Sequence, residues 1–357
     1  MKVAVLGGGS WGTALGRTLA TKGYEVRMWD IDVPTLEAMT NLHENTRYLP
    51  GVQLPDTLRG EPDLAVALDG VDLVVFAVPS HAMRGVGTQA AEHIPPGALL
   101  CSVTKGIEVD NLMTMSEVLQ DVLPQHLHSK LTFLSGPSFA VEVAREFPTA
   151  VTVAGTDAEV TAAVQHAFHA PFLRPYISDD VVGVEIGGCV KNVIAIATGA
   201  ADGLGYDANT RAATITRGLA EMTRLAVARG ANPLTLSGLA GVGDLVLTCS
   251  SVKSRNYRVG YALGQGRRLD DIQTELGQVA EGVLNTKSVK QLADQSGVYM
   301  PLTNTVHKLL YEGATLAAIG TTFAPDLPLK SEQEAHFNSF QPTAELTGEG
   351  RPPTPAG

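Results

Sequence analysis

Residues 2–15, KVAVLGGGSWGTAL, contain the clearest structural motif of the chain. The apolar run Lys2–Leu6 predicts a buried strand, and the segment Gly12–Lys22 has the periodicity of a helix. Between them, Gly7, Gly9 and Gly12 form the pattern Gly-x-Gly-x-x-Gly. These glycines permit a tight turn, close approach of a pyrophosphate and close packing of the helix on the strand. Alone the pattern also fits a flexible loop, but between strand and helix it predicts a dinucleotide-binding turn.

A candidate ligand for a ribose follows the second expected strand, Glu25–Trp29. Asp30 lies 18 residues after Gly12, near the position at which an acid of this fingerprint accepts a hydrogen bond from the adenosine ribose. The alternative is a solvated loop acid beside Asp32. The strand, the glycines and the acid together predict that NAD or NADP binds here.

Strands and helices alternate through the first half of the chain. Near-continuous apolar strands separated by helices are typical of a sheet that is covered on both faces. The pattern therefore predicts an α/β fold, with a doubly wound, mostly parallel sheet over residues 1–180. The other expected strands are Asp72–Val78, Leu99–Val103, Leu131–Leu134, Ala150–Ala154 and Leu173–Ile177, and the other helices are Ser80–His93 and Asp157–Ala170.

The strand signal disappears after about Ser178. From there the apolar residues recur at three- and four-residue spacing, which predicts an all-helical second domain over residues 181–327. Residues 328–357 are rich in Pro, Glu and Thr, and we expect a disordered tail. The expected helices are Gly183–Ala201, Thr210–Arg229, Asn256–Gly264, Val283–Ser296 and Thr303–Glu312.

Charge and cysteine content exclude several classes of protein. The 357 residues include 26 Lys+Arg and 37 Asp+Glu, a formal charge of −11, so no general field attracts nucleic acid or an anionic membrane. Glycines interrupt the N-terminal apolar run before a signal peptide could form, and no uncharged apolar run of about 18 residues follows. We expect reduced thiols at Cys101, Cys189 and Cys249, a cytoplasmic protein, and a loop without metal at His126 and His128.

Polar loops follow three of the expected strands. They lie at the carboxyl edge of the sheet, where open α/β sheets bind ligands. Lys105 comes directly after an apolar strand, which delivers its ammonium to this edge, although an exposed surface lysine fits equally well. The turn Gly136–Ser138 leads into the helix Phe139–Arg145, whose free N–H groups either face an anion or are simply capped. The loops are Val78-Pro79-Ser80, Thr104-Lys105-Gly106 and Ser135-Gly136-Pro137-Ser138.

Lys191 is the most informative single residue. It is the only cation in an apolar helix that contains small residues for close packing, such as Gly187 and Gly188. Burial would lower the pKa of its ammonium toward neutrality, which suits a proton donor or acceptor. A lysine that extends to the surface is the alternative.

A second polar cluster lies in the run 241–256. Asp244 is the one acid in an apolar, glycine-rich stretch, and it is placed to orient Lys191. Arg255, in Ser254-Arg255-Asn256, has the planar geometry that holds a phosphate with two hydrogen bonds. Taken singly, each of these residues also fits an ordinary capping or surface role.

These residues together resemble the NAD(P)-dependent glycerol-3-phosphate dehydrogenase family in its bacterial cytosolic form. The resemblance runs in order from Lys2 to about Glu312. Its motifs are residues 7–15, the three strand-end loops (the third extended to Ala140), residues 187–195, Arg217–Met222, Gly241–Leu245, Ser254–Asn256 and Glu281-Gly282.

The resemblance implies a Rossmann domain, a helical domain and catalysis in the cleft between them. The implied reaction is the reversible reduction of dihydroxyacetone phosphate to sn-glycerol 3-phosphate, which supplies glycerophospholipid synthesis. Lys191 resembles the family's catalytic proton carrier. Lys105, Gly136, Ser138, Asp244, Ser254, Arg255 and Asn256 resemble its substrate contacts, and Ser10, Trp11, Lys105, Ala140, Arg255, Val279 and Glu281 resemble its dinucleotide contacts.

Two other functions are compatible with parts of this pattern, and the preferred cofactor and the oligomeric state are separate questions. The chain could be another two-domain dehydrogenase, acting on a hydroxyacid or hydroxyacyl thioester, or a dinucleotide-sensing regulator without turnover. Many bacterial members carry a basic residue just after the tryptophan of the second strand, where this chain has Asp30-Ile31-Asp32, so we expect NAD to be favoured over NADP. A homodimer is compatible with a helical second domain, but the sequence locates no patch for it.

Overall fold

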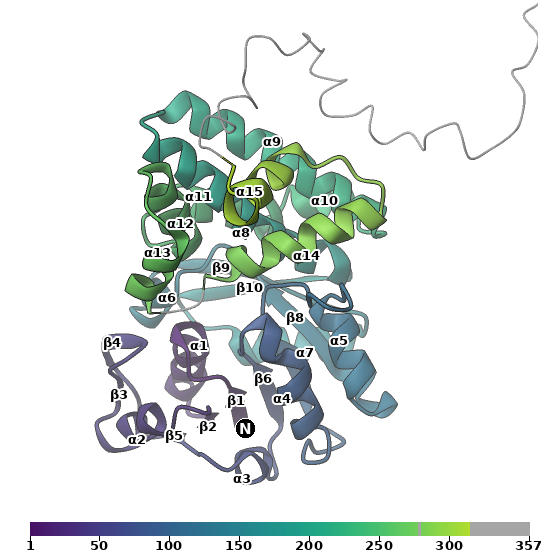
Figure 1. Cartoon of the computed structure of the whole chain (residues 1–357). Coiled ribbons are helices and arrows are strands. Elements are labelled where there is room, and N and C mark those ends of the chain that lie inside the picture. Colours follow the sequence, from purple (N-terminus) through teal and green to yellow (C-terminus); the bar gives the residue numbers. More distant parts are fainter. Residues whose placement is uncertain (278–279, 315–357) are drawn as a thin grey trace, which may run out of the picture.

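The computed structural model describes residues 1–277 and 280–314, and its first half is built on one eight-stranded sheet (Figure 1). The strands of this sheet are β1 (Lys2–Leu6), β2 (Glu25–Trp29), β5 (Leu58–Gly60), β6 (Leu73–Phe76), β7 (Leu99–Ser102), β8 (Leu131–Ser135), β9 (Thr149–Gly155) and β10 (Leu173–Ser178). Their order is β10-β9-β8-β7-β6-β1-β2-β5, and only the pair β8 and β9 is antiparallel. The mostly parallel sheet is therefore confirmed.

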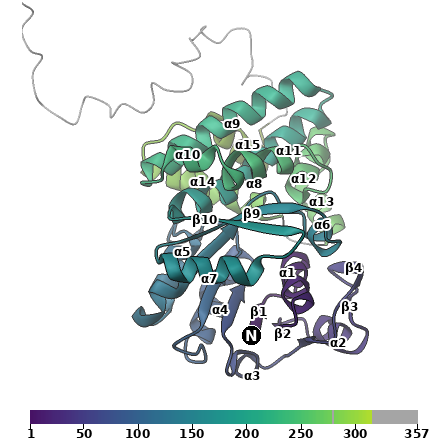
Figure 2. The same ribbon diagram turned by 180° about the vertical axis from the view of Figure 1, so that it is seen from behind.

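Helices cover both faces of the sheet. Side chains alternate along β1, so Val3 and Val5 lie in one apolar cluster with α1 (Ser10–Thr21) and α7 (Ala158–Phe168). Ala4 and Leu6 lie in the opposite cluster, with α3 (Leu64–Leu68), α4 (Met83–Ala90) and α5 (Met115–Val122). In Figure 2, which is seen from the side opposite to Figure 1, α7 lies in front of the sheet. The sheet is doubly wound, as expected.

The second half is helical and is organised around α8 (Val181–Gly203), which is buried along most of its length. The helices that pack against it are α9 (Ala208–Ala228), α11 (Asp244–Cys249), α12 (Arg255–Gly264), α14 (Glu281–Gln295) and α15 (Pro301–Tyr311). The contact with α12 requires glycine, because a Cβ at Gly260 would lie 2.0 Å from the carbonyl oxygen of Ile196. The other elements of this half are α10 (Pro233–Leu236), the π-helical turn η3 (Leu239–Gly243) and α13 (Leu269–Leu276).

By length and apolar composition, α8 is the one helix of the described residues that could cross a membrane. Most of it is buried inside the molecule, however, and it contains both Glu185 and Lys191. The core helix of a globular protein has the same composition, so this helix is weak evidence for a membrane span.

The sequence patterns missed several short elements. These are α2 (Val33–Asn41), α3, α5, α10, α11 and α13, the small sheet of β3 (Glu44–Asn45) and β4 (Leu49–Gln53), and strand β5. Elements of two to nine residues span too few turns or alternations for a clear period. His126 and His128 lie in the 3-10 helix η2 (Gln125–Lys130), not in the expected loop. The expected helix Ser80–His93 is divided into a 3-10 turn, η1 (Ser80–Ala82), and α4, and the expected helix Phe139–Arg145 is α6 (Ala140–Ala144).

Other expectations concern the thiols and the domain limits. Cys101, Cys189 and Cys249 are all buried and free, as expected. The last strand ends at Ser178 and α8 begins at Val181, with the Asp180 side chain accepting a hydrogen bond from the Gly183 N–H. The expected tail, residues 328–357, and the expected end of the second domain at residue 327 lie outside the described residues.

Candidate active site

One buried carboxylate joins the two lysines that the sequence singled out. Lys191 of α8 places its Nζ 2.9 Å from Oδ1 of Asp244, at the start of α11. Lys105, in the loop after β7, places its Nζ 2.6 Å from Oδ2 of the same carboxylate. Asp244 is only 1% exposed and Lys191 only 7% exposed. Three segments distant in the sequence thus form a compact trio of charges.

Thr248 completes this cluster, one turn after Asp244 on α11. Its hydroxyl accepts a hydrogen bond from Lys191 Nζ at 2.8 Å and donates one to Asp244 Oδ1 at 3.2 Å. An ammonium has three hydrogens to donate. The contacts to Asp244 and Thr248 use two of them, so within the described residues the third is available to a bound molecule.

The environment of the trio shifts the protonation of its members. Burial lowers the pKa of Lys191 to about 8, and the charge of Lys105 acts in the same direction, while Asp244 partly opposes both. Burial by itself would raise the pKa of Asp244, but the two ammoniums outweigh it and hold that pKa below its usual value. Near neutral pH the pair is therefore a carboxylate beside an ammonium that can give up its proton readily.

The turn after β8 lies against Lys105. Gly136 has a φ of +138°, a conformation that favours glycine, and its carbonyl oxygen accepts a hydrogen bond from Lys105 Nζ at 3.3 Å. The Ser138 hydroxyl donates to the same oxygen at 3.1 Å. Gly136 and Ser138 are thus brought to the lysine trio.

The start of α12 lies beside α8, the helix that carries Lys191. Ser254 caps this helix by accepting a hydrogen bond from the Tyr257 N–H, and Arg255 is exposed at its first position. Asn256 is buried, and its Nδ2 donates to Oδ1 of Asn192, the residue after Lys191, at 2.9 Å. Asn256 is therefore linked to the helix that carries Lys191.

The glycine turn after β1 fits a dinucleotide phosphate. A Cβ at Gly7 would lie 2.6 Å from the backbone of Ala77, and one at Gly12 would lie 2.0 Å from the carbonyl oxygen of Gly7, so neither position accepts a side chain. At Gly9, by contrast, nothing lies within 4 Å of such an atom. Gly9 precedes α1, whose first turn has no side-chain cap. The open space and the free N–H groups together make a cradle for an anion.

Asp30 supports this turn. Its Oδ2 accepts a hydrogen bond from the Gly8 N–H at 2.6 Å, and its Oδ1 accepts one from the Asp32 N–H at 2.9 Å. The carboxylate thus lies at the end of β2, beside the glycine turn. Arg47 also reaches this edge, where its guanidinium is 2.7 Å from Asp32 and stacks over the ring of Tyr48.

The remaining expected dinucleotide contacts occupy three places. Trp11 and Ala140 share one apolar cluster, because α6 packs against α1. The Ser10 hydroxyl donates to the carbonyl oxygen of Tyr48 at 2.6 Å. Glu281 begins α14 and accepts a hydrogen bond from the Ser80 hydroxyl at 2.8 Å, and it interacts electrostatically with Arg255. Val279 lies outside the described residues.

Family models of known proteins match both halves of the chain. The family model described as the N-terminus of NAD-dependent glycerol-3-phosphate dehydrogenase matches residues 2–161, and the model of the C-terminus matches residues 180–321. The chain belongs to the NAD-dependent glycerol-3-phosphate dehydrogenase family.

Individual relatives agree with the family models. The curated glycerol-3-phosphate dehydrogenase (NAD(P)+) of Anaeromyxobacter dehalogenans strain 2CP-C is 58% identical over 313 residues, which cover 88% of this chain and 94% of the relative. The crystal structure of glycerol-3-phosphate dehydrogenase from Coxiella burnetii is 41% identical, with a TM-score of 0.87 over 90% of this chain and 98% of that one. The Plasmodium falciparum glycerol-3-phosphate dehydrogenase is 26% identical, with a TM-score of 0.80 over 92% and 97%.

One more distant neighbour shares the fold alone. D-mandelate dehydrogenase is 14% identical with a TM-score of 0.62. A dehydrogenase named for another substrate therefore shares this fold, so the fold alone does not identify the substrate.

Sequence reasoning did not single out Thr248, Asn192 or Ser80 as site residues. Thr248 lies four residues after Asp244, a spacing that brings two side chains together only on a helix. Asn192 follows Lys191 directly, but its partner Asn256 is 64 residues away. Ser80 was noted only as part of a strand-end loop, and it binds Glu281 from 201 residues away. Of these three contacts, only that of Thr248 with Asp244 could have been predicted from the spacing of the two residues in the sequence.

Proposed function

We propose that this chain catalyses the reversible reduction of dihydroxyacetone phosphate to sn-glycerol 3-phosphate with NAD(P)H. The observation that carries the proposal is the trio Lys191–Asp244–Lys105, in which a buried ammonium with a lowered pKa retains a hydrogen for a bound molecule. Membership of the family supports the substrate class. The glycine cradle and Asp30 supply the place for the dinucleotide.

In this proposal Lys191 is the proton carrier. Reduction of the ketone builds negative charge on the carbonyl oxygen, and the Lys191 ammonium stabilises that charge and then donates its proton to the oxygen. Lys105 adds a second positive charge nearby. Asp244 and Thr248 hold Lys191 in place, because each contacts its Nζ. The bound nicotinamide supplies the redox chemistry, and the protein supplies position and charge.

The substrate phosphate is assigned to the start of α12. Arg255 presents a guanidinium there, and the backbone N–H groups of the first turn add donors. Asn256 and Ser254 fix this helix start, through Asn192 and through the cap on Tyr257. Gly136 and Ser138 belong to the turn after β8, beside Lys105, and are assigned to the same substrate.

The cellular setting completes the proposal. The product is a precursor of glycerophospholipids, so we assign the enzyme to the supply of lipid synthesis in the cytoplasm. We also propose a homodimer that works on a small-molecule substrate, without a nucleic-acid partner or insertion into a membrane. Size-exclusion chromatography with light scattering would test the dimer.

An assay of substrate-dependent cofactor oxidation tests the function. Purified protein should oxidise NADH or NADPH when dihydroxyacetone phosphate is added, which the loss of reduced-cofactor absorbance follows. Hydroxyacid precursors such as phenylglyoxylate or pyruvate serve as the control for another dehydrogenase class. Binding of reduced cofactor without any turnover would instead support a dinucleotide sensor.

The pH dependence should have opposite signs in the two directions. Reduction needs protonated Lys191, so its kcat should fall as pH rises through about 8. Oxidation of sn-glycerol 3-phosphate needs the neutral amine, so its kcat should rise over the same interval. Steady-state rates in both directions, measured across this pH range, check the prediction. Parallel profiles in the two directions would contradict it.

We propose that NADH is favoured over NADPH. The Asp30 carboxylate lies at the end of β2, where it suits ribose hydroxyls and repels a 2′-phosphate. The charge of Arg47 is compensated by Asp32 at 2.7 Å. One charge-assisted hydrogen bond amounts to about 1.5–3 kcal/mol, so kcat/KM should be about tenfold or more higher with NADH at equal ionic strength.

Two variants test the origin of this preference. Asp30→Arg should move the ratio toward NADPH, but it also removes the hydrogen bond to Gly8. Asp32→Asn leaves that bond intact and releases Arg47 for a 2′-phosphate, so it should also move the ratio toward NADPH. Equal efficiency of the wild type with the two cofactors would refute the preference.

A further inference from the structure

Glu185 is a buried carboxylate with no part in the mechanism above. It lies on α8, six residues before Lys191, and is 9% exposed. Its Oε1 accepts a hydrogen bond from the Ser116 N–H at 2.8 Å, and its Oε2 accepts one from the Ser116 hydroxyl at 2.5 Å. Ser116 belongs to the first turn of α5, in the sheet half of the molecule. Glu185 therefore ties the helix of the proton carrier to α5.

The start of α5 is hydrogen-bonded to the loop that carries Lys105. This loop leaves β7 after Ser102, and Ile107 forms a β-bridge with Thr114, the N-cap of α5. The Glu108 N–H also donates to the Met113 carbonyl oxygen at 2.8 Å. Lys105 is thus two residues from a hairpin that closes at Thr114, two residues before the Ser116 that Glu185 holds.

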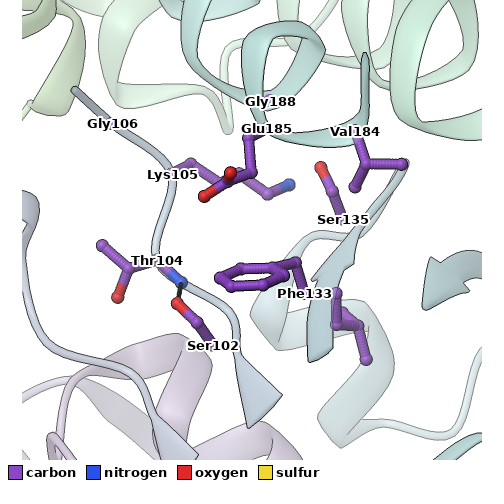
Figure 3. A pocket seen from close by; sticks show the side chains of 10 residues that line it. Ser102, Thr104, Lys105, Gly106, Phe133, Ser135, Val184, Glu185 and Gly188 are labelled. Carbon is purple, nitrogen blue, oxygen red and sulfur yellow. Dashed lines mark hydrogen bonds between the residues drawn. The ribbon is translucent and has the colours of Figure 1, made fainter. Parts of the chain in front are cut away.

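Glu185 and Lys105 also border the same small cavity (Figure 3). The cavity measures about 10 Å³, which is close to the space of one water molecule. Gly188, one turn after Glu185, lies against the Lys105 stem, since a Cβ there would be 3.4 Å from Lys105 Cγ. The Ser135 hydroxyl on its wall is buried without a hydrogen-bond partner in the described part of the chain. Glu185, Gly188 and Lys105 therefore lie around one small space, so the position of α8 relative to the Lys105 loop affects the lysine stem directly.

We propose that Glu185 is a positioning residue, which fixes the Lys105 ammonium relative to Lys191 by holding the start of α5 against α8. The inference rests on the proposed function of the two lysines. It accounts for the presence of a carboxylate in the buried helix α8, because both of its oxygens hold the first turn of another helix. Loss of this hold would shift Lys105 away from Asp244, whose other oxygen holds Lys191.

The hold on α5 should depend on pH. Burial raises the pKa of Glu185 to about 7, and its hydrogen bonds to Ser116 only partly oppose this. Two charged groups face Glu185: Glu117 on α5, and Lys105 across the cavity. Glu117 forms an ion pair with Arg229, the C-cap of α9. A protonated carboxyl is a weaker acceptor, so the hold weakens below about pH 7.

Glu221 offers a matched control. It is also buried, burial likewise raises its pKa to about 7, and it accepts hydrogen bonds from the first turn of a helix, at Leu302 N, Thr303 N and Thr303 Oγ1. That helix is α15, which carries none of the proposed site residues. Glu185→Gln and Glu221→Gln should therefore disturb comparable capping contacts, but only the first affects Lys105.

The experiment compares kcat/KM for dihydroxyacetone phosphate in the wild type and the two variants across pH. Misplacement by about 1 Å can cost about 100-fold in rate, so Glu185→Gln should lose about 10- to 100-fold and Glu221→Gln less than about twofold. In the wild type, kcat/KM should fall below about pH 7 as Glu185 becomes protonated. This fall should vanish in Glu185→Gln alone. All three proteins share the titration of the substrate phosphate, so the comparison cancels it.

The outcomes separate the two proposals. Absence of turnover in the wild type would refute the proposed function. An active wild type with Glu185→Gln matching Glu221→Gln in rate or in pH profile would overturn the role of Glu185. If Glu185→Gln fails to fold, Ser116→Ala removes only the hydroxyl contact. It should lower kcat/KM severalfold and move the fall at acid pH to higher pH, because this contact lowers the pKa of Glu185; wild-type behaviour of Ser116→Ala would overturn the proposal.

Discussion

Lys191→Ala should lower kcat for dihydroxyacetone phosphate reduction by about 10²- to 10⁴-fold, the range for a missing proton carrier. Asp244 retains its contact with Lys105 in this variant, so no buried charge is left without a partner. The glycine cradle and Asp30 share no hydrogen bond with Lys191 in the described residues, so NADH affinity should change little. Stopped-flow or steady-state turnover and fluorescence titration of NADH measure the two quantities.

Lys290→Ala is the control for this variant. This substitution also removes one ammonium and its ion pair, here with Asp294, but on the surface of α14. It should keep wild-type turnover. A Lys191→Ala enzyme that retains a tenth of wild-type kcat would remove Lys191 from the role of proton carrier.

Asp244→Asn should impair both activity and stability. The carboxylate faces two ammoniums, and its loss leaves both of them with an amide in place of a charge. Breaking a buried ion pair on one side costs about 3–5 kcal/mol. The pKa of Lys191 should fall further below 8, because Asp244 is the charge that opposes the effect of burial. The reduction rate at neutral pH should therefore fall by about 100-fold.

Chemical unfolding and the pH profile of kcat measure these two effects. Asp202→Asn is the matched control, because Asp202 is also a buried carboxylate, bonded to Arg211 and to the Tyr257 hydroxyl near the end of α8. It should lose stability and keep the pH profile. An Asp244→Asn enzyme with the wild-type profile would show that this carboxylate does not control the protonation of Lys191.

The sheet could be predicted because its strands are buried on both faces. Runs such as Lys2–Leu6 and Glu25–Trp29 are strands with these same ends in the structure. Helix α11 was not predicted because it has only six residues and follows a glycine-rich turn. The contact of Thr248 with Asp244, which depends on this helix, was therefore not predicted either. The pairing of Glu185 with Ser116 spans 69 residues, and no local pattern encodes such a contact. The assigned roles of the site residues remain predictions.

The single carboxylate shared by Lys105 and Lys191 has a consequence for how the chain can be divided. Lys105 belongs to the part of the chain before Ser178, whereas Lys191 and Asp244 follow Val181. A gene cut between these positions would give one fragment with the dinucleotide cradle and another with the proton carrier. Neither fragment holds all three charges, so turnover would return only when the fragments reassociate. Split expression of the two fragments would therefore report directly on their association in a cell.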